Sequence, residues 1–227
     1  MRVTARSVEF TYDEGGFCLR VPELEIEPGE RAAIVGASGC GKTTLLRLLT
    51  GIMPPQAGEV VVGDHQLHEM DDDARRAFRI QHIGFVFQDF RLIDYLDVRE
   101  NIRLPWRLNP ALQWTADSDQ CLEELAADLQ LTNQLNSPVD QLSQGEQQRT
   151  AIARAMLPQP GLILADEPTG NLDPDNKTRI LDLLLAQAQR TDATLLLATH
   201  DHALLPRLDR TLDFAQFTAS APETAHA

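Results

Sequence analysis

The chain has 227 residues, of which 43% are hydrophobic and 24% charged, and its formal net charge at pH 7 is −14. That length suits one globular domain with a substantial core, and the acidic charge argues against nucleic acid or direct lipid binding, since both need clustered Lys and Arg. No run approaches the ~18 apolar residues of a membrane helix and the first residues carry no apolar signal stretch, so we expect a cytoplasmic chain.

The N-terminal section predicts strands followed by a helix. Weak alternation over Val3–Phe10 and clearer alternation over Leu19–Ile26, which Pro22 interrupts, favour antiparallel strands near a sheet edge. Arg31–Val35 is a short apolar strand, and Thr43–Thr50 reads as a helix that a glycine and a Pro-Pro pair end.

Residues 36–43, between that strand and that helix, read GASGCGKT and fit the phosphate-loop pattern GxxxxGK[ST]. Glycines let backbone N–H groups turn toward phosphate oxygens, Lys42 can reach the β- and γ-phosphates, and Thr43 can ligate Mg²⁺. A chance glycine-rich turn would lack the flanking strand and helix. The expected nucleotide contacts are Gly36, Ala37, Ser38, Gly39, Cys40, Gly41, Lys42, Thr43 and Thr44.

The middle of the chain, from about residue 89 to 156, changes to helical spacing after a strand at Ile83–Phe87. Prolines divide this section into separate helices. Leu122, Leu125, Ala126 and Leu129 follow the i, i+3, i+4, i+7 pattern, which we interpret as core packing.

In the last third, strands at Leu162–Ala165 and Thr194–Thr199 flank a helix from about Pro174 to Arg190, a pattern typical of a mostly parallel α/β sheet. The first of these strands ends in Asp166 and Glu167. Asp166 suits the Mg²⁺ shell and Glu167 could act as general base on an attacking water. Taken alone, the pair could equally be a solvated acidic turn.

Residues 142–149, LSQGEQQR, have the S-x-x-E form of a capping box, with Ser143 as cap and Glu146 reaching back. Gly145 lets another group approach the backbone. A well-capped helix start explains the segment locally. The stretch also resembles the LSGGQ signature of ATP-binding cassette (ABC) ATPases, from which it departs at Gln144 and Glu146.

That resemblance implies an α/β P-loop NTPase fold with an N-terminal antiparallel section and an inserted helical subdomain. It implies one domain over 1–217, with a RecA-like core at about 1–88 and 157–217, a helical subdomain at about 89–156 and a loose tail at 218–227.

The resemblance also implies roles for residues in order along the chain. Ser143 and Gly145 would contact the γ-phosphate of ATP on a second, head-to-tail copy. Gln88 would sense Mg²⁺ and water, Asp173 would belong to the D-loop, and His200 would be the switch histidine. Asp173 followed by proline is also a helix start. Tyr12, with Phe10 as the alternative, would stack on adenine.

An ABC ATPase that lacks membrane helices is expected to bind ATP and Mg²⁺ and to power a separate integral membrane permease from the inner face of the cell membrane. Residues 87–88, 97–102, 104–105 and 170–174 resemble the branch containing LolD, MacB and FtsE, which favours export or lipoprotein release. An FtsE-like or SufC-like regulatory or assembly ATPase is the alternative. Neither the substrate nor the permease can be read from these residues.

Overall fold

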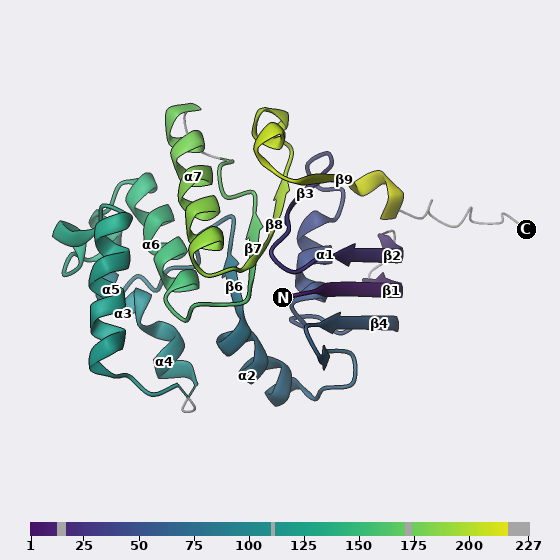
Figure 1. Cartoon of the computed structure of the whole chain (residues 1–227), viewed down its shortest axis with the longest axis horizontal. Helices are drawn as coiled ribbons and strands as arrows, with labels where there is room; N and C mark the ends of the chain where they lie inside the picture. The colour runs from purple at the N-terminus through teal and green to yellow at the C-terminus, as the bar shows by residue number, and fades with distance from the viewer. Residues whose placement is uncertain (13–16, 110–111, 171–173, 218–227) are drawn as a thin grey trace, which may run out of the picture.

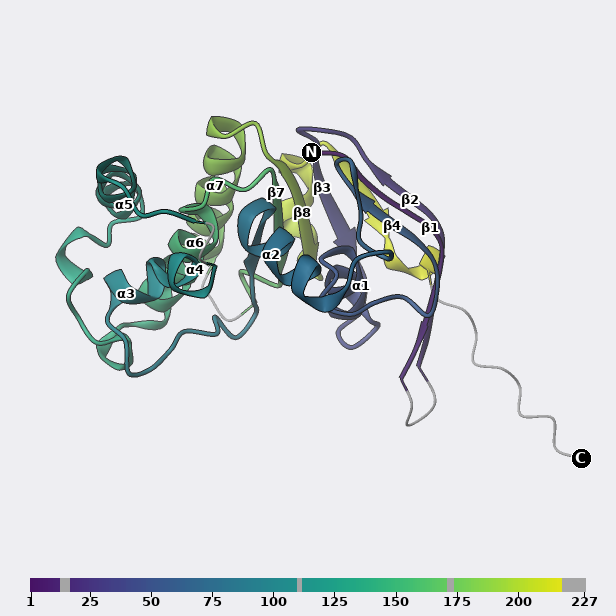
Figure 2. The same cartoon turned by 90° about the horizontal axis from the view of Figure 1, so that it is seen from below.

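Two β-sheets lie side by side, with a group of helices beyond the parallel one (Figures 1 and 2). The structure is a computed structural model, and it describes residues 1–227 except 13–16, 110–111, 171–173 and 218–227, with the side chains of 174 and 175 also outside the description. The predicted tail and D-loop therefore fall outside the described residues.

The antiparallel sheet has the strand order β2-β1-β4-β5, formed by β1 (Val3–Thr11), β2 (Cys18–Ile26), β4 (Ala57–Val62) and β5 (His65–Gln66). Strand β2 lies at the edge, where the missing N–H of Pro22 is tolerated. Ser7 of β1 has a φ of 50° between two paired positions, Arg6↔Glu23 and Val8↔Val21. The predicted antiparallel strands near an edge are confirmed.

The parallel sheet has the order β6-β7-β8-β3-β9. Its members are β6 (Ile83–Val86), β7 (Leu162–Asp166), β8 (Thr194–Thr199), β3 (Arg31–Val35) and β9 (Arg210–Asp213). In β7, Ile163 and Ala165 join the core that includes the middle helices, whereas Leu162 and Leu164 join the core beneath the antiparallel sheet. The continuous apolar runs therefore cover both faces of the sheet.

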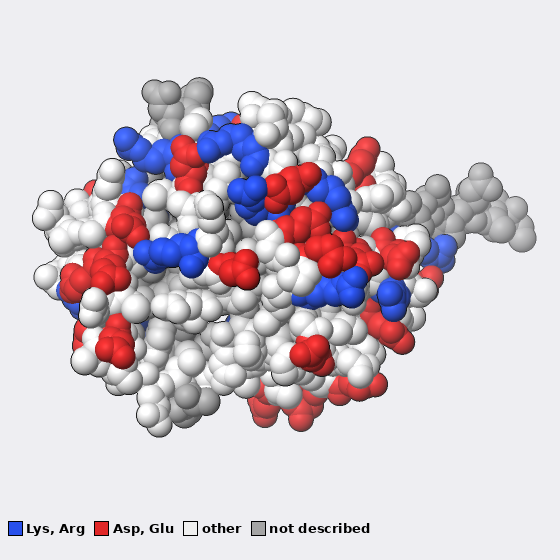
Figure 3. Space-filling view, viewed as in Figure 1, with Lys and Arg blue, Asp and Glu red and all other residues white. Residues whose placement is uncertain are grey.

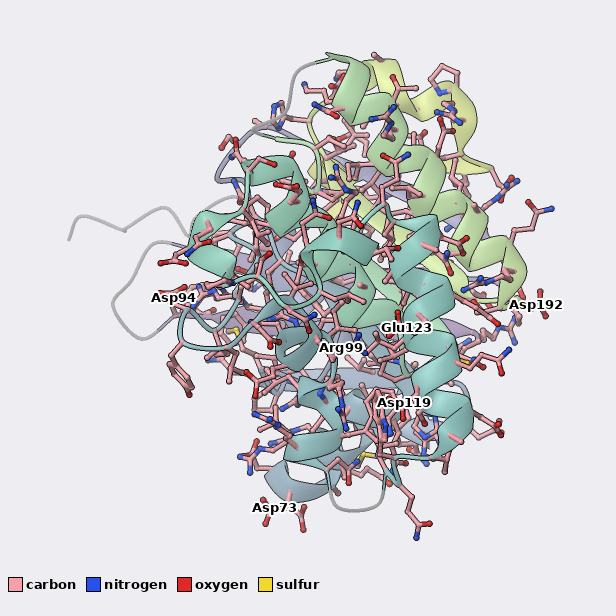
Figure 4. All side chains as sticks on the ribbon, turned by 90° about the vertical axis from the view of Figure 1, so that its left-hand side faces the viewer. Asp73, Asp94, Arg99, Asp119, Glu123 and Asp192 are labelled. Atoms are coloured by element: carbon pink, nitrogen blue, oxygen red, sulfur yellow. The ribbon has the colours of Figure 1, made fainter. Side chains whose placement is uncertain are left out.

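Helix α1 (Lys42–Leu49) follows β3, α2 (Asp72–His82) precedes β6, and α7 (Pro174–Arg190) precedes β8. Between β6 and β7 lie α3 (Val98–Ile102), α4 (Leu104–Leu108), α5 (Ala116–Asp128) and α6 (Gln144–Met156). The predicted apolar stripe of this section is buried. Arg99 on α3 pairs with Glu123 on α5 at 2.7 Å and ties these helices together (Figure 4).

Acidic and basic side chains are intermingled on the face shown in Figure 3. On the antiparallel sheet, Arg6 pairs with Glu23 and Arg20 with Glu9 across neighbouring strands. Within the described ranges, no helix has the length and apolar character needed to cross a membrane.

Candidate functional site

A pocket of about 300 Å³ lies at the carboxyl ends of the parallel strands, where open α/β sheets bind their ligands. Four neighbouring strands contribute: the phosphate loop follows β3, Gln88 follows β6, the acidic pair ends β7 and His200 follows β8. The lining residues are Tyr12, Ser38, Gly39, Gly41, Lys42, Thr43, Thr44, Arg47, Gln88, Asp166, Glu167 and His200.

Gly41 shapes the phosphate loop and starts α1. Its φ is 114°, and a Cβ there would lie 2.3 Å from Cζ of Phe17, so only glycine fits. Gly41 is the N-cap of α1 and makes no side-chain cap, which leaves the first N–H groups of the helix available to an anion. The loop is therefore built to receive phosphate oxygens.

Lys42 is held inside its own loop. Its Nζ donates hydrogen bonds to the carbonyl oxygens of Gly36, at 2.7 Å, and Ala37, at 3.0 Å, and lies 3.2 Å from Oε1 of Glu167. Gly36 and Ala37 thus position the lysine but do not line the pocket. Cys40 is half-buried and does not line it either.

Asp166 presents a buried oxygen with no hydrogen-bond partner in the described part of the chain, its Oδ1. Burial raises the pKa of this carboxyl, and a hydrogen bond with Thr43 acts in the opposite direction. An unpartnered carboxylate oxygen beside a threonine hydroxyl is the hard oxygen donor set that Mg²⁺ prefers in P-loop proteins. The residues present therefore fit that ion.

Glu167 connects the phosphate loop to the strand end that carries His200. It is buried, has a φ of 46°, and its Oε2 lies 2.8 Å from Nδ1 of His200. Asp201, the next residue after His200, pairs with Lys177 of α7 at 2.9 Å, which fixes this strand end. The pocket thus holds a carboxylate and an imidazole next to the expected phosphate site.

Tyr12 lies at the mouth of the pocket, 40% exposed, and its hydroxyl is 3.1 Å from Oγ1 of Thr44. Phe10, the alternative stacking residue, is only 8% exposed and packs edge-on against Tyr12, so it offers no free face to a base. Phe17 was missed by the sequence reasoning, although its ring centroid lies 6.0 Å from that of Tyr12.

Arg47 was also missed. It lies four residues after Thr43, which puts it on the same face of α1, and that helical spacing was the available signal.

Ser143 and Gly145 lie outside this pocket, at the start of α6. The capping box predicted there is present: Oε2 of Glu146 accepts from the Ser143 N–H at 2.8 Å and from its Oγ at 2.6 Å. These hydrogen bonds hold the pKa of Glu146 below its usual range. Ser143 and Gln144 are exposed. Asp173 lies outside the described residues.

Comparisons with known proteins agree with this architecture. A family model described as ABC transporter matches residues 19–170. The chain is 44% identical over 190 residues to the "Uncharacterized ABC transporter ATP-binding protein YbbA" of Escherichia coli (strain K12), covering 84% of this chain and 82% of that protein. It is 39% identical over 211 residues to the lipoprotein-releasing system ATP-binding protein LolD of Psychrobacter arcticus, covering 92% and 93%.

The fold also matches a solved structure described as the dimeric post-hydrolysis state of the ATP-binding cassette MJ0796 bound to ADP and Pi. The TM-score is 0.84 at 33% identity, covering 93% of each chain. A likeness to cbiO1 from Clostridium perfringens, at 23% identity, concerns the fold alone.

Proposed function

Because the chain belongs to the ABC transporter ATP-binding family, we propose that it hydrolyses ATP in a Mg²⁺-dependent reaction and thereby powers a separate membrane permease. The observation that carries this proposal is the pocket in which a phosphate loop, an unpartnered Asp166 oxygen, Glu167 and His200 converge. Each supplies one part of a phosphoryl-transfer site.

ATP binding is assigned to the phosphate loop, Lys42 and Tyr12. The free N–H groups at the start of α1 and the Lys42 ammonium take the β- and γ-phosphates, and the exposed Tyr12 ring stacks on adenine. Thr43, Asp166 and Gln88 would hold Mg²⁺, which neutralises charge on the phosphate oxygens.

Hydrolysis is assigned to Glu167 and His200. Glu167 accepts a proton from water as the water oxygen attacks the γ-phosphorus, and the bond from that phosphorus to the bridging oxygen of ADP breaks. His200 contacts the γ-phosphate. The 2.8 Å approach of His200 to Glu167 supports placing both residues at the same reacting group.

A head-to-tail pair of chains would complete each site. Ser143 is exposed and does not line the pocket of its own chain, which supports a role toward ATP bound by a second copy. The resemblance to ABC ATPases extends this role to Gly145 and Asp173. The solved relative that is 33% identical is described as a dimer. A two-fold arrangement of this kind uses the same surface of both copies.

The substitution Glu167→Gln tests this proposal. Removing the base should lower kcat for ATP hydrolysis by roughly 10²–10⁴-fold while the protein still binds ATP. Mass measured by light scattering after gel filtration should then show a dimer that forms with ATP and persists.

Glu69→Gln, an exposed carboxylate away from the pocket, is the matched control and should hydrolyse ATP normally. Normal turnover by Glu167→Gln would overturn the base assignment. A wild-type protein with no Mg²⁺-dependent ATPase activity would overturn the proposed function.

The permease is assigned to an apolar groove of about 320 Å³ between the parallel sheet and α4. Its lining includes Ile52 and Leu108, which are 37% and 60% exposed, and the basic Arg79 and Arg91. Exposed apolar residues beside cations suit a membrane-protein segment that carries carboxylates. A permease bound there would hold the chain at the inner face of the membrane, which is the location we propose.

The LolD relatives, whose names state lipoprotein release, support an export or release type of transporter. Purification in detergent with the proteins that accompany this chain distinguishes the possibilities. A membrane permease in the complex supports transport, whereas a soluble scaffold alone would instead support a regulatory or assembly ATPase.

A further inference from the structure

Two consecutive residues just after Gln88 adopt the left-handed conformation that normally favours glycine. Phe90 has a φ of 59° and Arg91 a φ of 49°. The turn is closed by hydrogen bonds from the Phe90 N–H to the Phe87 carbonyl, at 3.2 Å, and from the Arg91 N–H to the Asp89 carbonyl, at 2.6 Å. Such a backbone persists only where its surroundings determine it.

The surroundings are supplied by Arg154 of α6. Its Nη2 donates to the carbonyl oxygen of Phe90 and its Nη1 to that of Arg91. The residue is only 9% exposed, and none of the ion pairs among the described residues includes it. Burial lowers the pKa of Arg154 to about 10, so the guanidinium stays charged at neutral pH.

The hydrogen bonds of Arg154 link the loop after Gln88, which borders the ATP pocket, to the signature helix α6. Helix α6 starts at the signature segment and carries Arg154 in its last turn, whereas Gln88 lies two residues before the held carbonyls and lines the ATP pocket. Arg91 and Arg154 also line the apolar groove. Arg154 therefore belongs to α6, hydrogen-bonds the loop after Gln88 and lines the groove.

We propose that Arg154 is a positioning residue for Gln88: its forked hydrogen bonds to the Phe90 and Arg91 carbonyls fix the loop, and so set Gln88 at the ATP pocket relative to the signature helix. The inference rests on the proposed ATPase function. The proposed role requires arginine, because the planar guanidinium can donate to two carbonyl oxygens at once, whereas the single ammonium group of lysine cannot reach both in that geometry.

The test is a double-mutant cycle on steady-state ATP hydrolysis with Arg154→Lys and Gln88→Ala. Arg154→Lys alone should lower kcat by roughly ten- to hundredfold, because a small misplacement of a reacting group has that effect, with KM for ATP within about twofold of wild type. In the Gln88→Ala background, Arg154→Lys should change kcat by less than about twofold, since residues that act as one unit are not additive.

Arg99→Lys is the matched control, because Arg99 pairs with Glu123 away from the pocket, and its kcat should stay at the wild-type value. Equal, additive losses from Arg154→Lys in both backgrounds would overturn the inference while leaving the ATPase function intact. A wild type without ATPase activity would instead overturn the proposed function.

A second variant covers the case in which Arg154→Lys does not fold. Arg154→Ala leaves a cavity beside the two carbonyls, and free guanidinium ion at a non-denaturing concentration should restore part of kcat. Methylammonium at the same ionic strength should not. Equal effects of the two cations would contradict the need for a forked donor.

Discussion

The buried carboxylate of Asp166 destabilises the folded protein when neither Mg²⁺ nor nucleotide is bound. The carboxyl is almost fully buried, with one oxygen that has no partner among the described residues, and burial raises its pKa. The folded protein therefore binds a proton at this carboxyl more tightly than the unfolded chain does. The stability that this preference contributes is present below the ordinary pKa of aspartate and is lost as pH rises through the raised value.

Asp166→Asn should therefore raise the melting temperature of the protein at pH 8 in EDTA without nucleotide, because it removes a buried charge. The gain should shrink as pH falls toward the ordinary aspartate range. The same variant should lose the extra stability that MgATP gives the wild type. Thermal unfolding followed by circular dichroism measures both effects.

Asp209→Asn is the control of opposite sign. Hydrogen bonds from Arg31 hold the pKa of Asp209 below its usual range, so this group stabilises the fold above the ordinary pKa and stops doing so as pH falls through the lowered value. Its replacement should lower the melting temperature at pH 8. A lower melting temperature for Asp166→Asn under the same conditions would contradict the burial argument.

At the level of single residues, the sequence was most informative where neighbouring residues in one short motif form the local structure by themselves. The phosphate loop and the acidic pair are each contiguous, so their residues could be predicted without the fold, and the structure brings both segments to the same pocket. Arg47 lines the pocket through its place on α1, and Phe17 contacts Tyr12 from the other side of the β1–β2 connection, neither of which a short motif contains. Phe10 shows the reverse: its aromatic type suggested stacking, but its strand position buries it.

In the first turn of α6, the hydrogen bonds that stabilise the helix start oppose the binding of a γ-phosphate that we propose for Ser143. Glu146 accepts both the N–H and the hydroxyl of Ser143, so the hydroxyl is already occupied by a carboxylate. A γ-phosphate from a second copy would have to displace that carboxylate and approach its charge. A like charge so near would oppose closure of the dimer.

Glu146→Gln should therefore strengthen ATP-dependent dimerisation. Glutamine keeps the capping box but carries no charge, so the ATP concentration for half-maximal dimer formation, measured by light scattering in the Glu167→Gln background, should fall several-fold. Glu146→Ala, which removes the box as well, should lower stability by about 0.5–1 kcal/mol as a cap is weakened. Weaker dimerisation by Glu146→Gln would show that the carboxylate assists closure.

Helices and strands could be predicted from the sequence where their buried residues form a regular apolar pattern. Strands β7 and β8 are buried throughout and have apolar central residues, and α5 has a regular buried stripe, so both types of element were predicted. Helix α2 buries only Phe78 and therefore shows no stripe, while β9 is a four-residue edge strand with no buried residue. These elements are fixed by pairing and caps, such as Asp71 accepting from the Ala74 N–H, rather than by an apolar pattern.

For the whole molecule, the pocket and the apolar groove lie on either side of the loop that follows Gln88. Gln88 faces the pocket and Arg91 lines the groove, three residues apart. A permease segment seated in the groove would therefore contact the same short loop that completes the ATP site. This arrangement allows nucleotide state and permease position to be coupled over a few residues.

The last prediction separates docking from catalysis. Leu108→Asp puts a negative charge on the most exposed apolar side chain of the groove, so the chain should no longer co-purify with the proposed permease in detergent, because the new carboxylate would repel the carboxylates of the docking segment and compete for the basic side chains of the groove. Its ATPase activity in isolation should stay at the wild-type level, because Leu108 does not line the pocket. Gln189→Asp, an exposed position on α7 outside the groove, adds the same charge and should leave co-purification unchanged. Retained co-purification by Leu108→Asp would place the permease on another surface, whereas loss of activity in the isolated chain would mean that the groove supports catalysis directly.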